Sequence, residues 1–239
     1  MSAGRAVLIT GTARGVGRAM ALHLAAPETH LLLHHRGPRA ELTDLRRACA
    51  DRGARVTPLR ADLADVEARE RLLAEVRAVT DVLHVLVNNV GVFGETPLLE
   101  LTPAEWQRTF DATCTAAFHL TQGLVPLLRA GAPARVVNLG DSGADRIVAR
   151  PRATAYHVAK LGVHVLTRSY AKVLGPDGIT VNQISPGFLE NSVGEPGVRL
   201  PAGRPGRFAD VLGALDYLLS PQAGYVTGAN LVVSGGWNL

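Results

Sequence analysis

The sequence is poor in cysteine and lysine, and it lacks any long hydrophobic run. Its two cysteines, Cys49 and Cys114, lie far apart and without metal-ligand spacing, so neither a disulfide framework nor a zinc site is expected. The eight histidines show no paired ligand spacing such as His-x-x-x-His on one helix, and no metal is expected. No apolar stretch approaches the ~18 residues that a membrane span needs. We therefore expect neither a disulfide-stapled, a metal-dependent nor a membrane protein.

Composition predicts an ordinary globular protein. The chain has 239 residues, of which 47% are hydrophobic and 19% are charged, and we expect one domain that covers residues 1–239. Its net charge is +4, but the arginines are scattered among acids, so a small anionic ligand is expected and nucleic acid is not. The N-terminus shows no pattern of a secretory leader, and the expected location is the cytoplasm.

Short apolar runs alternate with longer segments in which apolar residues recur every three to four positions. We expect strands at residues 6–10, 30–35, 55–59, 82–88, 135–139, 180–184 and 230–233. We expect helices at residues 16–26, 40–52, 66–80, 103–129, 153–174 and 208–219. The alternation predicts an α/β fold: one doubly wound parallel sheet of about seven strands, of the Rossmann type, with helices on both faces. A stretch rich in glycine and proline, at about residues 187–207, is predicted to be a substrate lid.

A glycine-rich turn joins the first expected strand to the first expected helix. Glycines in such a turn let the backbone approach a pyrophosphate, and the N–H groups of the helix point at the anion. The cofactor-binding residues predicted here are Gly11, Arg14, Gly15, Val16 and Gly17. An ordinary tight turn is the alternative interpretation of this pattern.

The end of the second expected strand indicates which dinucleotide is bound. A protein that prefers NAD usually has an Asp or Glu there for the ribose hydroxyls, whereas this chain has His35 and Arg36. Arg36 and Arg14 offer two guanidinium groups to a 2′-phosphate. We therefore predict NADP(H) as the cofactor; two solvated loop arginines are the alternative.

Further motifs follow in a fixed order along the chain. They are Thr10-Gly11-x-x-x-Gly15-x-Gly17, Asp62-Leu63, Asn88-Asn89-Val90-Gly91, Tyr156-x-x-x-Lys160, Pro186-Gly187, Thr227-Gly228 and Gly235-Gly236. In this order the sequence resembles the short-chain dehydrogenase/reductase family over essentially its whole length. The resemblance implies an NADP(H)-dependent oxidoreductase whose cofactor is also contacted by Asp62, Leu63, Asn89, Gly91, Pro186 and Gly187.

Tyr156 and Lys160 are four residues apart, so they share one face of the expected helix. An ammonium group beside a phenol favours the phenolate, and we expect Lys160 to lower the pKa of Tyr156. The family resemblance implies that Tyr156 gives a proton to the substrate and that Lys160 also holds the nicotinamide ribose.

Two positions depart from the family pattern. The family usually has a serine three residues after the Asn of the fifth strand, but Asp141 stands there and Ser142 follows it. Either residue is the third catalytic group. The family commonly has an Asn that holds a relay water in the middle helix, and Thr113 occupies that position.

The substrate is predicted only as a class. Asp141, the His-Arg pair and Phe93 resemble the pteridine-reductase branch, in which an aromatic residue stacks on the pterin; plain wall packing is the alternative for Phe93. We predict hydride transfer to a small polar C=O or C=N compound, with Phe93 and Phe188 as substrate contacts. Reduction of 3-oxoacyl thioesters of an acyl carrier protein is an alternative, and a non-catalytic NADP(H)-binding regulator is another. The expected assembly is a homo-oligomer, a tetramer or a dimer.

Overall fold

The computed structural model describes residues 4–143, 146–192 and 199–237. Its centre is a parallel seven-stranded sheet in the order β3-β2-β1-β4-β5-β6-β7. The strands are β1 Arg5–Ile9, β2 Thr29–His35, β3 Arg55–Arg60, β4 Val85–Asn88, β5 Arg135–Leu139, β6 Thr180–Pro186 and β7 Asn230–Val233. The predicted doubly wound α/β fold is confirmed.

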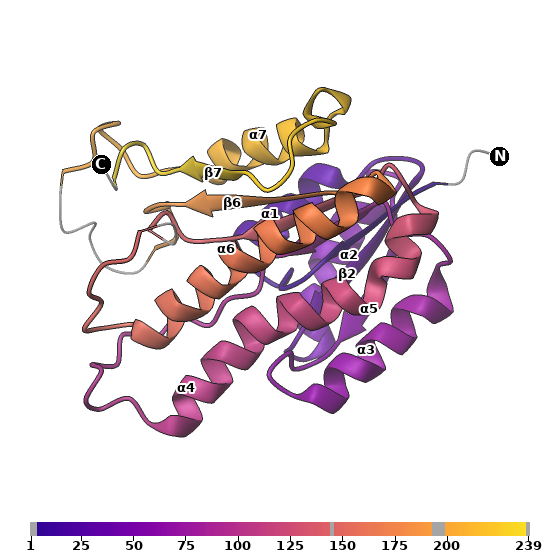
Figure 1. Ribbon diagram of the computed structural model, residues 1–239. Coiled ribbons are helices and arrows are strands. Elements are labelled where there is room, and N and C mark those ends of the chain that lie inside the picture. The colour runs from indigo at the N-terminus through magenta and orange to yellow at the C-terminus, as the bar shows by residue number, and fades with distance from the viewer. Residues whose placement is uncertain (1–3, 144–145, 193–198, 238–239) are drawn as a thin grey trace.

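Helices cover both faces of the sheet (Figure 1). They are α1 Gly15–Leu24, α2 Thr43–Ala50, α3 Val66–Val79, α4 Pro103–Phe110, α5 Ala116–Ala130, α6 Thr154–Leu174 and α7 Phe208–Leu219. One apolar core joins the sheet to α3, α5 and α6, and a second joins it to α1, α2 and α7. Almost every residue of β1, β2, β4 and β5 is buried because helices lie on both sides.

The structure corrects three expected elements. The helix expected at 103–129 is divided into α4 and α5 by one π-helical turn, η2 Asp111–Thr115. The helix expected at 40–52 begins as a 3₁₀ turn, η1 Arg39–Leu42, before α2. The strand β4 starts three residues later than expected, because Leu83 N–H bonds the carbonyl of Leu127 in α5 instead of a neighbouring strand.

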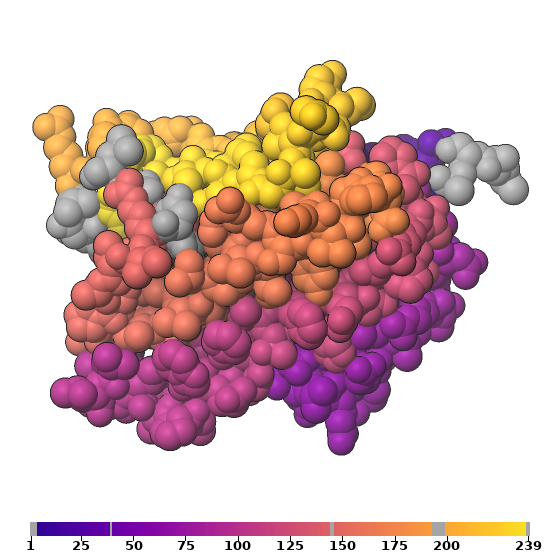
Figure 2. Space-filling model, in the orientation of Figure 1, coloured from indigo at the N-terminus to yellow at the C-terminus, as the bar shows by residue number. Residues whose placement is uncertain are grey.

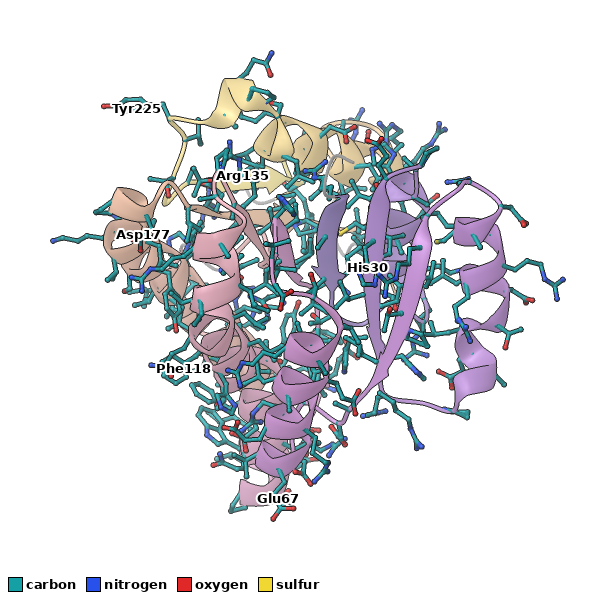
Figure 3. All side chains as sticks on the ribbon, turned by 90° about the vertical axis from the view of Figure 1, so that its right-hand side faces the viewer. His30, Glu67, Phe118, Arg135, Asp177 and Tyr225 are labelled. Atoms are coloured by element: carbon teal, nitrogen blue, oxygen red, sulfur yellow. The ribbon has the colours of Figure 1, made fainter. Side chains whose placement is uncertain are left out.

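All strands end at the same edge of the sheet, which is the left-hand side of Figure 1. Figure 3 views the opposite edge, where Arg135 opens β5 and His30 stands near the start of β2. The strand order reverses between β1 and β4, because the chain builds one half of the sheet up to β3 and then returns to start the other half at β4. The loops after β1 and β4 therefore diverge. Ligands of open α/β sheets bind in the crevice that this divergence creates.

Candidate active site

A cavity of about 950 Å³ lies at the carboxyl edge of the sheet, where β4, β5 and β6 end. It brings together residues from the glycine turn, from α6 and from the segments after these strands. Of the predicted site residues, those that line it are Val16, Asn89, Gly91, Phe93, Asp141, Ser142, Tyr156, Lys160, Pro186, Gly187 and Phe188.

The glycine turn is built for close approach. Gly11 and Gly15 have φ angles of 71° and 59°, a region that other residues rarely adopt. A Cβ on Gly17 would lie 2.3 Å from the carbonyl oxygen of Gly11, so only glycine lets α1 begin against the turn. Asn89 fixes the turn from the next strand, because its Nδ2 donates to the carbonyls of Thr10 at 2.8 Å and Gly11 at 3.2 Å.

His34 supports the same turn, and the sequence analysis did not assign it a role. Its Nδ1 accepts a hydrogen bond from Gly11 N–H at 3.1 Å, and its Nε2 donates to the carbonyl of Ala61 at 3.1 Å. Burial lowers the pKa of this imidazole to about 4, against an ordinary 6.5. His34 is therefore neutral and bridges the glycine turn to the end of β3.

The charged residues predicted to hold the nucleotide lie in the glycine turn and at the ends of β2 and β3. Arg14 and Arg36 are exposed, whereas His35 is buried in β2. Burial opposes ionisation of Asp62, but the Ala64 amide, Arg108 and Arg36 together lower its pKa. Arg108 pairs with Asp62 at 3.0 Å. The charge of Arg36 therefore acts on Asp62, which places the two side chains near each other.

Leu63 takes no part in the cavity lining. Its side chain is buried in the core that α3, α5 and α6 share with the sheet.

Lys160 is a buried cation at the centre of the cavity wall. Its Nζ donates to the carbonyl of Leu139 at 2.5 Å and lies 5.7 Å from the ring centroid of Tyr156. Burial lowers its pKa to about 8. A Cβ on Gly91 would lie 3.0 Å from the Lys160 Nζ, so glycine at that position keeps room for the ammonium group.

The expected lowering of the pKa of Tyr156 is wrong for this structure. Burial raises the pKa of the phenol, and the carboxylate of Asp141 raises it further. Burial is the larger of these two causes, and both disfavour the phenolate. Tyr156 is held in its protonated form.

Asp141 and Ser142 differ in what they contact. Asp141 Oδ1 accepts a hydrogen bond from Gly143 N–H at 3.2 Å, and its charge raises the pKa of both Tyr156 and Lys160. The side chain of Ser142 is buried, and its backbone N–H donates to the carbonyl of Pro186 at 3.1 Å. The carboxylate is thus coupled electrostatically to the tyrosine and lysine.

Thr113 lies in the π-helical turn η2 and is buried. Its Oγ1 accepts a hydrogen bond from Val92 N–H at 3.2 Å. The hydroxyl therefore ties η2 to the loop after β4, next to Phe93.

Aromatic side chains form two walls of the cavity. Phe93 is 55% exposed and meets the ring of Tyr156 edge to face, with centroids 5.1 Å apart and an angle of 86°. Phe188 lies against Trp237 with ring centroids 6.2 Å apart. An exposed aromatic ring beside the tyrosine leaves a flat face available to a ligand.

The segment expected to be a lid is anchored at both of its ends. Gly206 N–H donates to the carbonyl of Phe188, and Glu190 N–H donates to that of Gly206. Residues 193–198 of the lid lie outside the described part of the chain.

Within the described residues, neither a membrane-spanning helix nor a metal-binding cluster adds to the site. Across residues 4–143, 146–192 and 199–237, no helix is both long and apolar enough to cross a membrane. Within these same ranges, no cluster of three or more His, Cys, Asp or Glu residues could hold a metal ion.

The fold and the site define a class of protein: a dinucleotide-dependent oxidoreductase with a Tyr-Lys pair. A family model described as enoyl-(acyl carrier protein) reductase matches residues 11–238. The chain belongs to the short-chain dehydrogenase/reductase family.

Its relatives include several reductases. The chain is 30% identical over 242 residues to a 3-oxoacyl-[acyl-carrier-protein] reductase of Haemophilus influenzae, covering 98% of each chain. It is 32% identical over 247 residues to L-xylulose reductase of Homo sapiens, covering 98% of this chain and 97% of that one.

Solved structures similar to this one include cofactor complexes. A blue fluorescent protein from a metagenomic library, in complex with NADPH, is 28% identical with a TM-score of 0.90, covering 99% of this chain and 98% of that one. A short chain dehydrogenase of Burkholderia cenocepacia in complex with NADP is 27% identical with a TM-score of 0.89, at the same coverage.

Proposed function

We propose that this protein is an NADPH-dependent reductase that acts on a C=O or C=N bond of a small polar substrate. The observation that carries the proposal is the buried ammonium of Lys160, 5.7 Å from the ring of Tyr156, at the wall of the cavity. Burying an ammonium group costs stability, and such groups are retained where a site uses them.

The residues around the glycine turn fit a dinucleotide. The close approach at Gly17 and the helix N-terminus of α1 suit a pyrophosphate, and Gly91 leaves room beside Lys160 for a ribose. Arg14 and Arg36 would hold a 2′-phosphate. When bound, the nicotinamide supplies the hydride.

Tyr156 is the proton donor in this proposal. Its raised pKa keeps the proton on the phenol until the oxygen or nitrogen of the substrate becomes more basic. Lys160, with a pKa of about 8, is mostly charged at neutral pH and stabilises the phenolate that forms. Its hydrogen bond to the Leu139 carbonyl fixes the ammonium in position.

Asp141 is the third group that we propose for the site. The support is the negative charge of Asp141, which raises the pKa of both Tyr156 and Lys160. Single substitutions test the choice: Asp141→Ala should lower turnover by about 10²-fold, the lower end of acid-base contributions, whereas Ser142→Ala should change it little. Loss of turnover in Ser142→Ala alone would reverse the assignment.

Two substrate classes have specific support. The flat exposed face of Phe93 beside Tyr156, together with Asp141, favours a pteridine. The likeness to 3-oxoacyl-[acyl-carrier-protein] reductases over 98% of the chain favours a 3-oxoacyl thioester. A non-catalytic regulator would have no need for a buried lysine beside the tyrosine.

The experiment follows NADPH oxidation by the purified protein with a dihydropterin and with a 3-oxoacyl thioester, using Tyr156→Phe as the blank. Turnover of one substrate alone assigns the class. NADPH binding without oxidation by either substrate or by a panel of other carbonyl and imine compounds would favour the regulator.

We also propose that the protein works as a homo-oligomer in the cytoplasm. Helices α5 and α6 lie side by side at the surface of the molecule (Figure 2). Tyr170 Oη of α6 donates a hydrogen bond to the carbonyl of Phe118 in α5 at 3.0 Å. Phe118, at the outer side of α5 in Figure 3, and Val165 of α6 are 40% and 56% exposed. Light scattering after gel filtration should give the mass of a dimer or tetramer, and Val165→Asp should lower it; a monomer would contradict the proposal.

A further inference from the structure

One titratable group in the cavity, His157, has no role in the chemistry above, and it lies beside Asp141. Asp141 follows β5, and His157 lies in α6 directly after Tyr156. Their Oδ1 and Nδ1 atoms are 3.9 Å apart, and their side chains are 12% and 21% exposed. Both residues line the cavity. They form a carboxylate-imidazole pair beside the tyrosine.

His157 connects the reaction centre with the cavity. Its ring meets that of Tyr156 nearly edge to face, with centroids 5.5 Å apart and an angle of 72°. Because the imidazole remains partly exposed, it can exchange protons with water. Burial is the main cause of the raised pKa of its neighbour Tyr156.

Burial and two charged groups act on His157. Burial lowers its pKa, Asp141 after β5 raises it, and Arg150 in the loop before α6 lowers it. Arg150 lies close to Asp141, because its Nη2 would be 2.5 Å from a Cβ on Gly143, whose own N–H binds Asp141 Oδ1. The net lowering leaves the imidazole neutral at neutral pH, in a form that can accept a proton from water.

We propose that Asp141 and His157 form a proton-transfer pair that restores the proton Tyr156 gives up in each turnover. Water gives a proton to the neutral imidazole of His157, and the Nδ1 of the imidazolium passes a proton to the Asp141 carboxylate across one intervening water, because 3.9 Å is too long for a direct hydrogen bond. The carboxylic acid that forms then gives its proton to the phenolate of Tyr156. Each group returns to its starting form, so one proton enters from solvent for each proton that Tyr156 delivers. This inference rests on the proposed reductase activity.

Thr113 in η2 offers a less suitable route for the proton. Thr113 is 2% exposed, and its hydroxyl accepts a hydrogen bond from Val92 N–H at 3.2 Å. A threonine hydroxyl does not titrate in the physiological range, whereas an imidazole does. The route through His157 contains the titratable group, and the side chain of His157 is 21% exposed.

The first test needs no substrate. Histidine imidazole signals are titrated by NMR in the wild type, with His157 assigned by its loss in His157→Gln. In Asp141→Asn the midpoint of His157 should move to lower pH, because the charge that raises its pKa is removed. In Glu95→Gln, which removes another carboxylate from the same cavity, the midpoint should stay unchanged. An unmoved midpoint in Asp141→Asn would overturn the pair.

The second test separates proton transfer from a structural role. His157→Ala should lower kcat by about 10- to 100-fold, and imidazole added to the buffer should restore much of the loss. A loss that imidazole does not restore, or an unchanged kcat, would overturn the relay. If the wild type reduces neither substrate, the proposed function fails, and the NMR titration still decides whether the two groups are coupled.

Discussion

At the scale of single residues, the site depends on groups whose ionisation the fold has shifted. Burial lowers the pKa of Lys160 to about 8 and raises that of Tyr156. Both shifts oppose the charged forms, and each costs stability whenever the group is charged. The site is therefore a place where function and stability conflict.

Replacing Lys160 should expose that conflict. The folded pKa of about 8 lies below the ordinary 10.5, so at neutral pH the buried charge costs about 3 kcal/mol. Lys160→Met removes the charge but leaves the Leu139 carbonyl without its donor, so the free energy of unfolding should rise by about 1–2 kcal/mol. Turnover should be lost.

Urea unfolding at pH 7 measures this difference. Lys172→Met, in the last turn of the same helix, is the matched control and should change the free energy of unfolding little. A Lys160→Met protein that is less stable than the wild type would contradict the argument.

Arg36 should decide which dinucleotide is preferred. Arg36→Asp replaces a phosphate ligand by a carboxylate that binds ribose hydroxyls and repels phosphate. We expect KM for NADPH to rise by about 10- to 100-fold, as loss of a charge-assisted hydrogen bond implies, while KM for NADH falls. Steady-state kinetics with NADPH and with NADH measure the two KM values. An equal change in KM for both cofactors would show that Arg36 does not contact the 2′-phosphate.

At the scale of elements, the contact of α1 with the glycine turn is the tightest point of the cofactor site. Gly17→Ala forces a Cβ to within 2.3 Å of the Gly11 carbonyl, so α1 must move away. We expect a loss of about 1–3 kcal/mol in stability and of most NADPH binding.

Gly213→Ala provides the matched control for this substitution. Gly213 lies in α7 with nothing within 4 Å of an added Cβ, so the change should stabilise the protein by about 0.5–1 kcal/mol. Thermal unfolding and NADPH fluorescence titration measure both variants. Equal effects of the two substitutions would show that the close approach is unimportant.

At the scale of the whole molecule, His34 links stability to pH. Its pKa is about 4 in the folded protein and 6.5 in the unfolded chain, so protons bind the unfolded chain more readily. The contribution of neutral His34 to the free energy of unfolding is complete above pH 6.5. It is lost as pH falls towards 4, by about 3 kcal/mol in total.

Urea unfolding over this pH range tests the linkage. His34→Gln cannot take up a proton, and its stability should fall less steeply with acid than that of the wild type. Identical slopes in the two proteins would show that another group causes the acid sensitivity.

Much of this molecule could be predicted from local patterns. The alternation of strands and helices, the glycine turn and the four-residue spacing of Tyr156 and Lys160 depend on short stretches of chain. The break at η2 could not be predicted, because residues 103–129 read as one continuous apolar pattern. Its π-helical turn is tied by Thr113 to Val92, which is 21 positions away.

The sequence by itself determined the family, the parallel sheet and the identity of many of the residues that line the cavity, because these follow from periodicity and from motifs a few residues long. Only the tertiary structure decided the ionisation of Tyr156, the support of the glycine turn by His34, and the pairing of Asp141 with His157. These depend on burial and on distances between segments far apart in the chain, and a pKa follows the surroundings of a group more than its neighbours in sequence.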